Sequence, residues 1–325
     1  MKSDDASQDN FGFRSVFWTT GVVAALAALM MIFLVPESTA DLKEKMDWVG
    51  VLPLVVAVGA ALIALNELGT LADADRVLVI GLFAVAAAAF LAFWRVENRS
   101  GHPLVATELL RRRSTWALLL NTVLTMTGVF AVMNGLVPAL ARDATVGFGT
   151  SAGEPAWWTL TPYALAWLAV GPLSGRLAAT HGYLKVLRIG MIGSVVSLGV
   201  MLLVVGSDSR LLLLRAFVLI GLTYAGTGNI ILDGLGIVLS PKESPGFLPG
   251  LDTGAFNLGA GLSLAVILAA KTALSPADGS GTAGYHGALV AGLLILAVAF
   301  ATSFLIPRPE GAEAAAPAVP VPVGH

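Results

Sequence analysis

Residues 16–35 of the chain read VFWTTGVVAALAALMMIFLV. None of these side chains is charged, and a helix of about 20 apolar residues is long enough to cross a hydrocarbon core about 30 Å thick. Inside lipid the backbone must satisfy its own hydrogen bonds, which a helix does within one segment. This stretch therefore predicts a membrane-spanning helix.

The composition of the whole chain supports a membrane protein. Hydrophobic residues make up 56% of the sequence and charged residues 12%, whereas a soluble domain carries about 25% charged residues. With no cysteine and four scattered histidines, we expect no disulfide, thiolate catalysis, metal site or cofactor. A net charge of -2 gives no electrostatic footprint for nucleic acid. The sequence shows no paired acid and base and no activated nucleophile that would indicate an enzyme.

Further apolar blocks follow, separated by loops that contain glycine, proline and charged residues. Together they predict an all-α polytopic membrane protein with about nine transmembrane helices. Their expected ranges are 16–35, 48–68, 76–95, 115–140, 157–179, 184–206, 211–239, 247–273 and 286–306. Residues 1–15 form a polar N-terminal tail, and 307–325, rich in alanine, proline and valine, are expected to be disordered.

The distribution of lysine and arginine predicts the orientation of the chain in the plasma membrane, because cytoplasmic loops carry the excess of basic residues. Nine spans place the two termini on opposite sides. The side of the C-terminus holds twelve lysines and arginines and the other side seven. We therefore expect a cytoplasmic C-terminus and tail, and an N-terminus outside the cell.

Five stretches, in this order and spacing, resemble the 14-helix drug/proton antiporters of the major facilitator superfamily. They are FRSVFWTTGV (13–22), MDWVGVLPLVVAVGAALIALNEL (46–68), HPLVATELLRRRSTWALLL (102–120), GPLSGRLAATHGYLKVLRIG (171–190) and PKESPGFLPGLDTGAFNLGAGLSLAVI (241–267). The chain is similar to helices six to fourteen of that family and lacks a match to the first five.

The resemblance implies a division of the chain. Residues 16–35 would be the last helix of an N-terminal bundle, 36–113 two linker helices with a basic cytoplasmic loop, and 114–306 a six-helix C-terminal bundle. It implies secondary active transport, proton-coupled export of hydrophobic or cationic drugs, with lipid, protons and the small solute as partners. A separate N-terminal transporter half could complete the cavity. The alternative is a remnant or membrane subunit that does not transport by itself.

Ionisable residues within a membrane are costly and are default candidates for function. Asp233 is the sharpest, with Asn229 one turn before it, and could exchange protons or contact substrate; a packing contact is the alternative. Asp252 begins the range 247–273 and could equally be a first-turn charge favoured by the helix dipole. Asn257 is a further candidate in the same range.

Helix 115–140 holds three polar candidates, Asn121, Thr125 and Asn134. Asn121, Thr125 and Gly128 share one helical face, and Asn134 lies on another with Thr127 and Ala131. Hydrogen bonding between helices explains these residues as well as substrate contact does. Three aromatic side chains could stack on an aromatic or cationic solute; they are Tyr163, Trp167 and Tyr224.

The loops hold the candidate gate residues. Arg142 and Asp143 close helix 115–140 and are either a gate pair or a solvated loop pair. Arg176, Lys185 and Arg188 belong to a basic turn, which the family resemblance and the positive-inside rule explain equally well. Two small-xxx-small pairs, Gly171 with Gly175 and Gly250 with Gly254, predict close helix packing.

Overall fold

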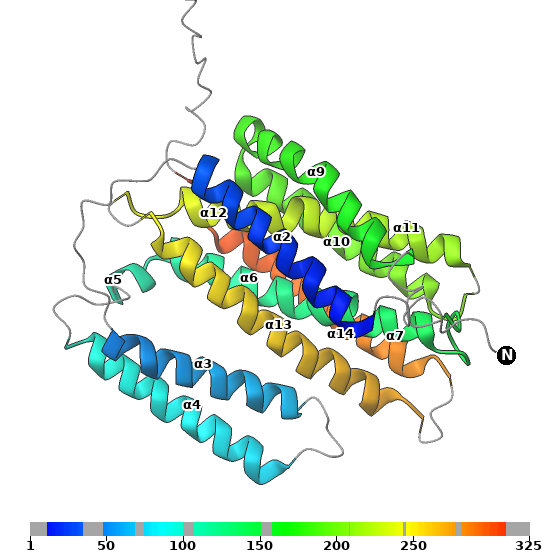
Figure 1. Ribbon diagram of the computed structural model, residues 1–325, viewed down its shortest axis with the longest axis horizontal. Helices are drawn as coiled ribbons and strands as arrows, with labels where there is room; N and C mark the ends of the chain where they lie inside the picture. The colour runs from blue at the N-terminus through cyan, green and yellow to red at the C-terminus, as the bar shows by residue number, and fades with distance from the viewer. Residues whose placement is uncertain are drawn as a thin grey trace, which may run out of the picture. The chain divides into compact units, whose positions relative to one another are not determined.

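A computed structural model describes residues 12–34, 48–68, 75–99, 107–150, 158–207, 209–242, 245–276 and 281–309, and Figure 1 shows them as helices joined by loops. Within these ranges the fold is all-helical, as the sequence predicts. Most of the tails predicted at 1–15 and 307–325 lies outside the described residues.

The helices match the predicted ranges closely. The first is α2 (Gly12–Leu34), which forms a compact unit separate from residues 47–325. Two helical stretches, predicted as uninterrupted spans, each contain a π-helical segment. The other elements are α3 (Trp48–Leu68), α4 (Arg76–Glu97), α5 (Thr107–Leu110), α6 (Arg113–Ala131), η1 (Val132–Leu136), α7 (Val137–Arg142), α9 (Leu160–His181), α10 (Tyr183–Val204), α11 (Arg210–Ile220), η2 (Gly221–Asn229), α12 (Ile230–Val238), α13 (Phe247–Leu274), α14 (Ala283–Thr302) and η3 (Ser303–Leu305).

Six of the described helical stretches are long and apolar enough to cross a membrane, compared with the nine predicted. They are Arg76–Glu97, Arg113–Arg142, Tyr183–Val204, Arg210–Val238, Phe247–Leu274 and Ala283–Leu305. Shorter apolar helices lie at Thr20–Leu34 and Val51–Glu67, within α2 and α3. The remaining predicted span, α9, contains Arg176 and His181 together with several hydroxyl side chains, which lower its hydropathy.

Helix α6 lies at the centre of the packed bundle. It packs against α13 and α14, while η2 packs against α9 and α10, and the α3–α4 hairpin joins the bundle through α13. The core between these helices is aliphatic, with methionines filling the remaining space. Its largest fully buried side chains include Phe217, Leu118, Met126, Met133, Leu187 and Met201.

Glycines let α6 approach its two neighbours closely. A Cβ added at Gly292 of α14 would lie 2.6 Å from the carbonyl oxygen of Gly128 on α6, and one added at Gly259 of α13 would lie 2.6 Å from the carbonyl oxygen of Val123. The predicted close packing of two glycine pairs was wrong at three positions, because a Cβ at Gly175, Gly250 or Gly254 would meet nothing within 4 Å.

Polar contacts tie the helix ends together. At one end, Arg113 Nε of α6 donates to the carbonyl oxygen of Leu305, at 2.8 Å. At the other end, the Tyr285 hydroxyl of α14 donates to Asp143 Oδ2 at 3.2 Å and accepts from Lys271 Nζ of α13 at 3.2 Å. These bonds tie α6 to the segment after α14 at one end of the bundle, and α13 and α14 to the loop after α7 at the other.

Candidate functional site

Two π-helical segments, η1 and η2, interrupt otherwise regular helices in the middle of the bundle. π-Helical turns are rare and are frequently found at functional sites. Side chains satisfy backbone groups around them: Ser263 Oγ accepts from the Ala131 N–H just before η1, at 2.9 Å, and Thr227 Oγ1 donates to the Leu222 carbonyl within η2, at 2.8 Å. These segments are therefore stabilised features of the fold.

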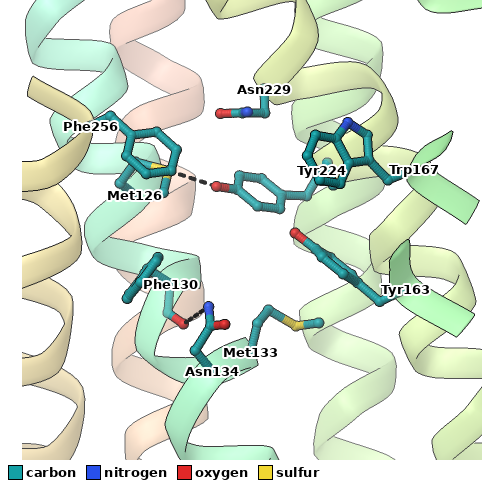
Figure 2. A pocket seen from close by; sticks show the side chains of 10 residues that line it. Met126, Phe130, Met133, Asn134, Tyr163, Trp167, Tyr224, Asn229 and Phe256 are labelled. Carbon is teal, nitrogen blue, oxygen red and sulfur yellow. Dashed lines mark hydrogen bonds between the residues drawn. The ribbon is translucent and has the colours of Figure 1, made fainter. Parts of the chain in front are cut away.

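The two π segments face each other across a pocket of about 150 Å³. Figure 2 shows the side chains converging from α6 and η1 on one side and from η2 and α9 on the other. Ten residues line the pocket, and five of them belong to π-helical turns. The lining is Met126, Phe130, Met133, Asn134, Tyr163, Trp167, Tyr224, Ala225, Asn229 and Phe256.

The polar groups of the pocket are a phenol pair and two amides. The Tyr224 hydroxyl donates to Met126 Sδ, 2.6 Å away, across the pocket; sulfur is a weak acceptor, so a better acceptor can replace it. Asn134 Nδ2 donates to the Phe130 carbonyl at 3.0 Å, which leaves Asn134 Oδ1 free to accept. The Asn229 side chain makes no hydrogen bond to another described residue.

The pocket lining is aromatic and uncharged. Trp167, 43% exposed, and Tyr163 present ring surface beside Tyr224 (Figure 2), while Phe130 and Phe256 pack edge to face with centroids 6.5 Å apart. All three predicted stacking residues thus line one pocket. Its volume is below the about 300–1,000 Å³ of common ligand sites.

Both acidic candidates lie beside the pocket and outside its lining. Asp233 is one helical turn beyond Asn229, on the first turn of α12, and its side chain is exposed. Asp252 on α13 is buried, with 3% of its surface exposed, and accepts a hydrogen bond from Thr122 Oγ1 at 2.6 Å. The two carboxylates are near enough to interact electrostatically.

The remaining membrane candidates do not line this pocket. Asn121 is buried between α6 and α14, where its Nδ2 donates to the Ala299 carbonyl at 2.6 Å and to Thr302 Oγ1 at 2.9 Å. Thr125 is buried, and its hydroxyl lacks a hydrogen-bond partner. Asn257 is exposed on α13 and donates to the carbonyl one turn earlier, at 2.8 Å.

Arg142 and Asp143 form no ion pair with each other in the described residues. Arg142 Nε donates to the Pro138 carbonyl of its own helix, at 3.4 Å. Asp143 Oδ1 accepts from the hydroxyl and the N–H of Thr145 at 2.7 and 2.9 Å. Desolvation by burial acts to raise the pKa of Asp143, but hydrogen bonds from Thr145, the Val146 N–H and Tyr285 together hold it below its ordinary value. Asp143 organises this loop.

The basic turn joins α9 to α10 through Gly182, whose φ of 91° is unfavourable for other residues. Arg176 and Lys185 are exposed on either side of it. Arg188 is half-buried, and its guanidinium lies 4.1 Å from the centroid of the Phe304 ring. This turn is at the opposite end of the bundle from Asp143.

Sequence reasoning missed the apolar part of the lining: Met126, Phe130, Met133, Ala225 and Phe256. In a chain this hydrophobic an apolar side chain carries no signal of its own. Interruption of the helical repeat by η1 also could not be read from the sequence. Asn134 is exposed and lines the pocket, whereas Ala131, predicted on the same helical face, is fully buried. In the described residues no group of three or more acidic or histidine side chains could hold a metal ion.

The chain matches the model of the Major Facilitator Superfamily over residues 7–264. It is 50% identical over 302 residues to the uridine/deoxyuridine transporter of Lactococcus lactis subsp. cremoris (strain MG1363), covering 91% of this chain and 62% of that protein. Multidrug resistance protein 3 of Bacillus subtilis (strain 168) is 27% identical over 172 residues, 53% of this chain and 32% of the relative. Multidrug resistance protein Stp of Mycobacterium tuberculosis (strain CDC 1551 / Oshkosh) is 26% identical over 263 residues, 80% and 47% of the two chains.

The chain thus spans less than two thirds of the length of each of these relatives. The family match covers most of the chain, and the all-helical fold with its long apolar helices agrees with it. The chain is a polytopic membrane protein that belongs to the major facilitator superfamily.

Proposed function

We propose that this chain forms one wall of the cavity of a secondary transporter for uncharged, planar solutes of the pyrimidine nucleoside type. The observation that carries the proposal is the pocket between η1 and η2, whose lining is aromatic with amide and phenol groups and contains no charged side chain. In transporters such sites lie between two repeats that rock against each other. The second wall comes from helices that this chain does not supply.

The pocket has the two kinds of contact that a pyrimidine base needs. An aromatic ring such as Trp167 or Tyr163 offers a face for stacking, worth about 1–3 kcal/mol per base. A carboxamide both donates and accepts, so the unengaged amide of Asn229 complements the alternating carbonyl and N–H groups of a uracil edge. Asn134 Oδ1 can accept from a sugar hydroxyl.

The similarity to a uridine/deoxyuridine transporter supports this substrate class. The second candidate is export of hydrophobic or cationic drugs, which the similarity to two multidrug resistance proteins favours. A cationic drug would be expected to approach an acidic side chain, and the nearest described one along the chain is Asp233, one turn from Asn229. The substrate class therefore depends on whether binding requires the uncharged pocket or this carboxylate.

Proton coupling is the part of the proposal that rests on the acidic pair. We place the coupling proton on Asp252, which is buried and accepts a hydrogen bond from one neutral hydroxyl, that of Thr122. Asp233, exposed and within electrostatic reach of Asp252, would exchange that proton with the cavity.

Binding of radiolabelled uridine to the purified chain in detergent tests the substrate class. Trp167→Ala should weaken uridine binding by about 5- to 150-fold, since a stacked base is worth about 1–3 kcal/mol. Trp116→Ala is the matched control, because Trp116 is 42% exposed, as Trp167 is 43% exposed, but lies outside the pocket. Asn229→Ala should weaken uridine binding and leave binding of the planar cation ethidium unchanged.

Two results would overturn the nucleoside assignment. One is equal uridine affinity in the Trp167→Ala and Trp116→Ala variants. The other is ethidium binding that is tighter than uridine binding and is lost in Asp233→Asn, which would favour the drug-export candidate.

Proton coupling is tested by uridine uptake into cells at several external pH values. Asp252→Asn should abolish the pH dependence of uptake, and an unchanged pH profile would remove Asp252 from the mechanism.

The same uptake assay addresses the non-transporting alternative. Chain that binds uridine but does not carry it into cells would be a membrane subunit that needs a partner half to complete its cavity. Co-production with the helices that the chain lacks should then restore uptake.

A further inference from the structure

A groove of about 450 Å³ lies at the basic end of the bundle, away from the aromatic pocket. It is formed by the turn between α9 and α10, by the first half of α10 and by the end of the described chain after η3. Three cationic side chains line it: Lys185, Arg188 and Arg308. A fourth basic residue, His181, stands at its rim, before Gly182.

These cations are not neutralised by the described part of the chain. Lys185 and Arg308 are exposed, and no described carboxylate forms an ion pair with any of the three. Arg188 is held in place by the Phe304 ring, 4.1 Å from its guanidinium carbon, and by a donated bond to the Ser303 carbonyl at 3.4 Å. Its Nε is buried without a hydrogen-bond partner, so the guanidinium retains unused donors.

The groove continues into an apolar stripe along α10. Ile189 and Ile192 line the groove itself and are 62% and 50% exposed, and Val196 and Leu203 farther along are 54% and 66% exposed. Their spacing from Lys185 is four, seven, eleven and eighteen residues, which places all of them on one helical face. The three cations of the groove therefore lie at the end of an exposed apolar stripe on α10.

We propose that this groove binds an anionic phospholipid. The phosphate lies among Lys185, Arg188 and Arg308, and an acyl chain lies along Ile189, Ile192 and Val196. Arginine and lysine are the side chains that recognise phosphate, and the first-turn N–H groups of α10, which no side chain caps, add a partial positive charge. Basic pockets at the cytoplasmic ends of membrane helices are suited to anionic lipid head groups.

The apolar stripe favours a lipid over a soluble anion. Inorganic phosphate would use the three cations but none of the exposed side chains of α10, whereas a phospholipid uses both. This site is independent of the transported solute, since the groove shares no residue with the aromatic pocket.

Native mass spectrometry of the purified chain with added dioleoylphosphatidylglycerol tests the proposal. The double variant Lys185→Gln/Arg308→Gln removes two exposed charges and no core packing. Each juxtamembrane cation contributes about 1 kcal/mol to binding of anionic lipid, so the variant should retain this lipid roughly 30-fold less well. The matched control is Arg95→Gln/Arg99→Gln, which removes two exposed cations of α4 and its C-terminal turn and should retain the lipid as the wild type does.

Three results would overturn the lipid site. The first is equal loss of phosphatidylglycerol in the groove variant and in the α4 control. The second is retention of dioleoylphosphatidylcholine, which carries no net charge, as strong as that of phosphatidylglycerol. The third is full displacement of the lipid by millimolar inorganic phosphate, which would make the groove a site for soluble anions. If the double variant fails to fold, Arg308→Gln alone, at an exposed position outside every helix, provides the same comparison with Arg99→Gln.

Discussion

The contact between Gly128 and Gly292 offers the most direct test of how α6 and α14 are packed. Gly292→Ala would place a Cβ 2.6 Å from the Gly128 carbonyl oxygen, where ordinary contact begins at 3.4 Å, so the two backbones must separate by about 0.8 Å. Both groups are rigid, because the obstacle is helical backbone and not the end of a side chain. Overpacking of this kind costs about 1–3 kcal/mol.

Replacing glycine by alanine also favours the helix itself, by about 1 kcal/mol. Gly199→Ala isolates this gain, since a Cβ at Gly199 of α10 would meet nothing within 4 Å. We expect the free energy of unfolding of Gly292→Ala to lie about 1–3 kcal/mol below that of Gly199→Ala. The assay is unfolding of the purified chain in mixed micelles with increasing dodecyl sulfate, followed by circular dichroism.

Gly128→Ala tests the same crossing from the other side, where the added Cβ would lie 2.9 Å from the Gly292 carbonyl oxygen. Once one alanine has separated the helices, the second finds room, so the double variant should cost less than the sum of the two single variants. Equal stability of Gly292→Ala and Gly199→Ala would refute the reasoning, as would strict additivity of the two alanines.

Three further outcomes are expected in the same unfolding assay. Thr122→Val removes the hydrogen bond to buried Asp252 and should lower the free energy of unfolding by about 1–3 kcal/mol. Thr122→Ser keeps the hydroxyl and should lose less stability. Equal losses in the two variants would mean that this bond is unimportant. Tyr285→Phe removes the hydroxyl that joins Lys271 to Asp143 and should cost about 0.5–1.5 kcal/mol; no change would show that the link is solvated. The pKa of Asp143 lies below its ordinary value of 3.8, so its stabilising contribution is present above that value and is lost as the pH falls through the lower, folded-state pKa. When the free energy of unfolding is measured between pH 3 and 6, Asp143→Asn should therefore lose less stability at the acid end than the wild type does. Identical dependence of stability on pH in the two proteins would contradict this role of Asp143.

The positions of the helices could be predicted from the sequence because each depends on one strong local signal. An uncharged block of about 20 residues has few alternatives to a helix in a membrane, and the loops are marked by glycine, proline and charge. Thus α3 and α13 begin at the predicted residues, Trp48 and Phe247. Residues that share a regular helical face were also predicted correctly: Asn121 and Gly128 both face α14.

The site could be predicted only in part, because a pocket depends on contacts between distant segments. Tyr163, Trp167 and Tyr224 were chosen for their chemistry, and they meet in one pocket because η2 packs on α9. Asp233 and Asp252 were chosen for their charge, and they lie outside its lining. The glycines that allow close contact, such as Gly128 and Gly259, carry no motif that separates them from glycines with empty surroundings.

The π-helical turn at Val132–Leu136 bears on how such a pocket can change during evolution. A single inserted residue in a membrane helix would normally rotate everything beyond it by about 100° and destroy its packing. A π turn absorbs the surplus residue locally, so the helical segments on either side, Arg113–Ala131 and Val137–Arg142, need not rotate against the rest of the bundle. Insertion or deletion at this point would therefore exchange the residues that line the pocket while leaving the helix bundle as it was.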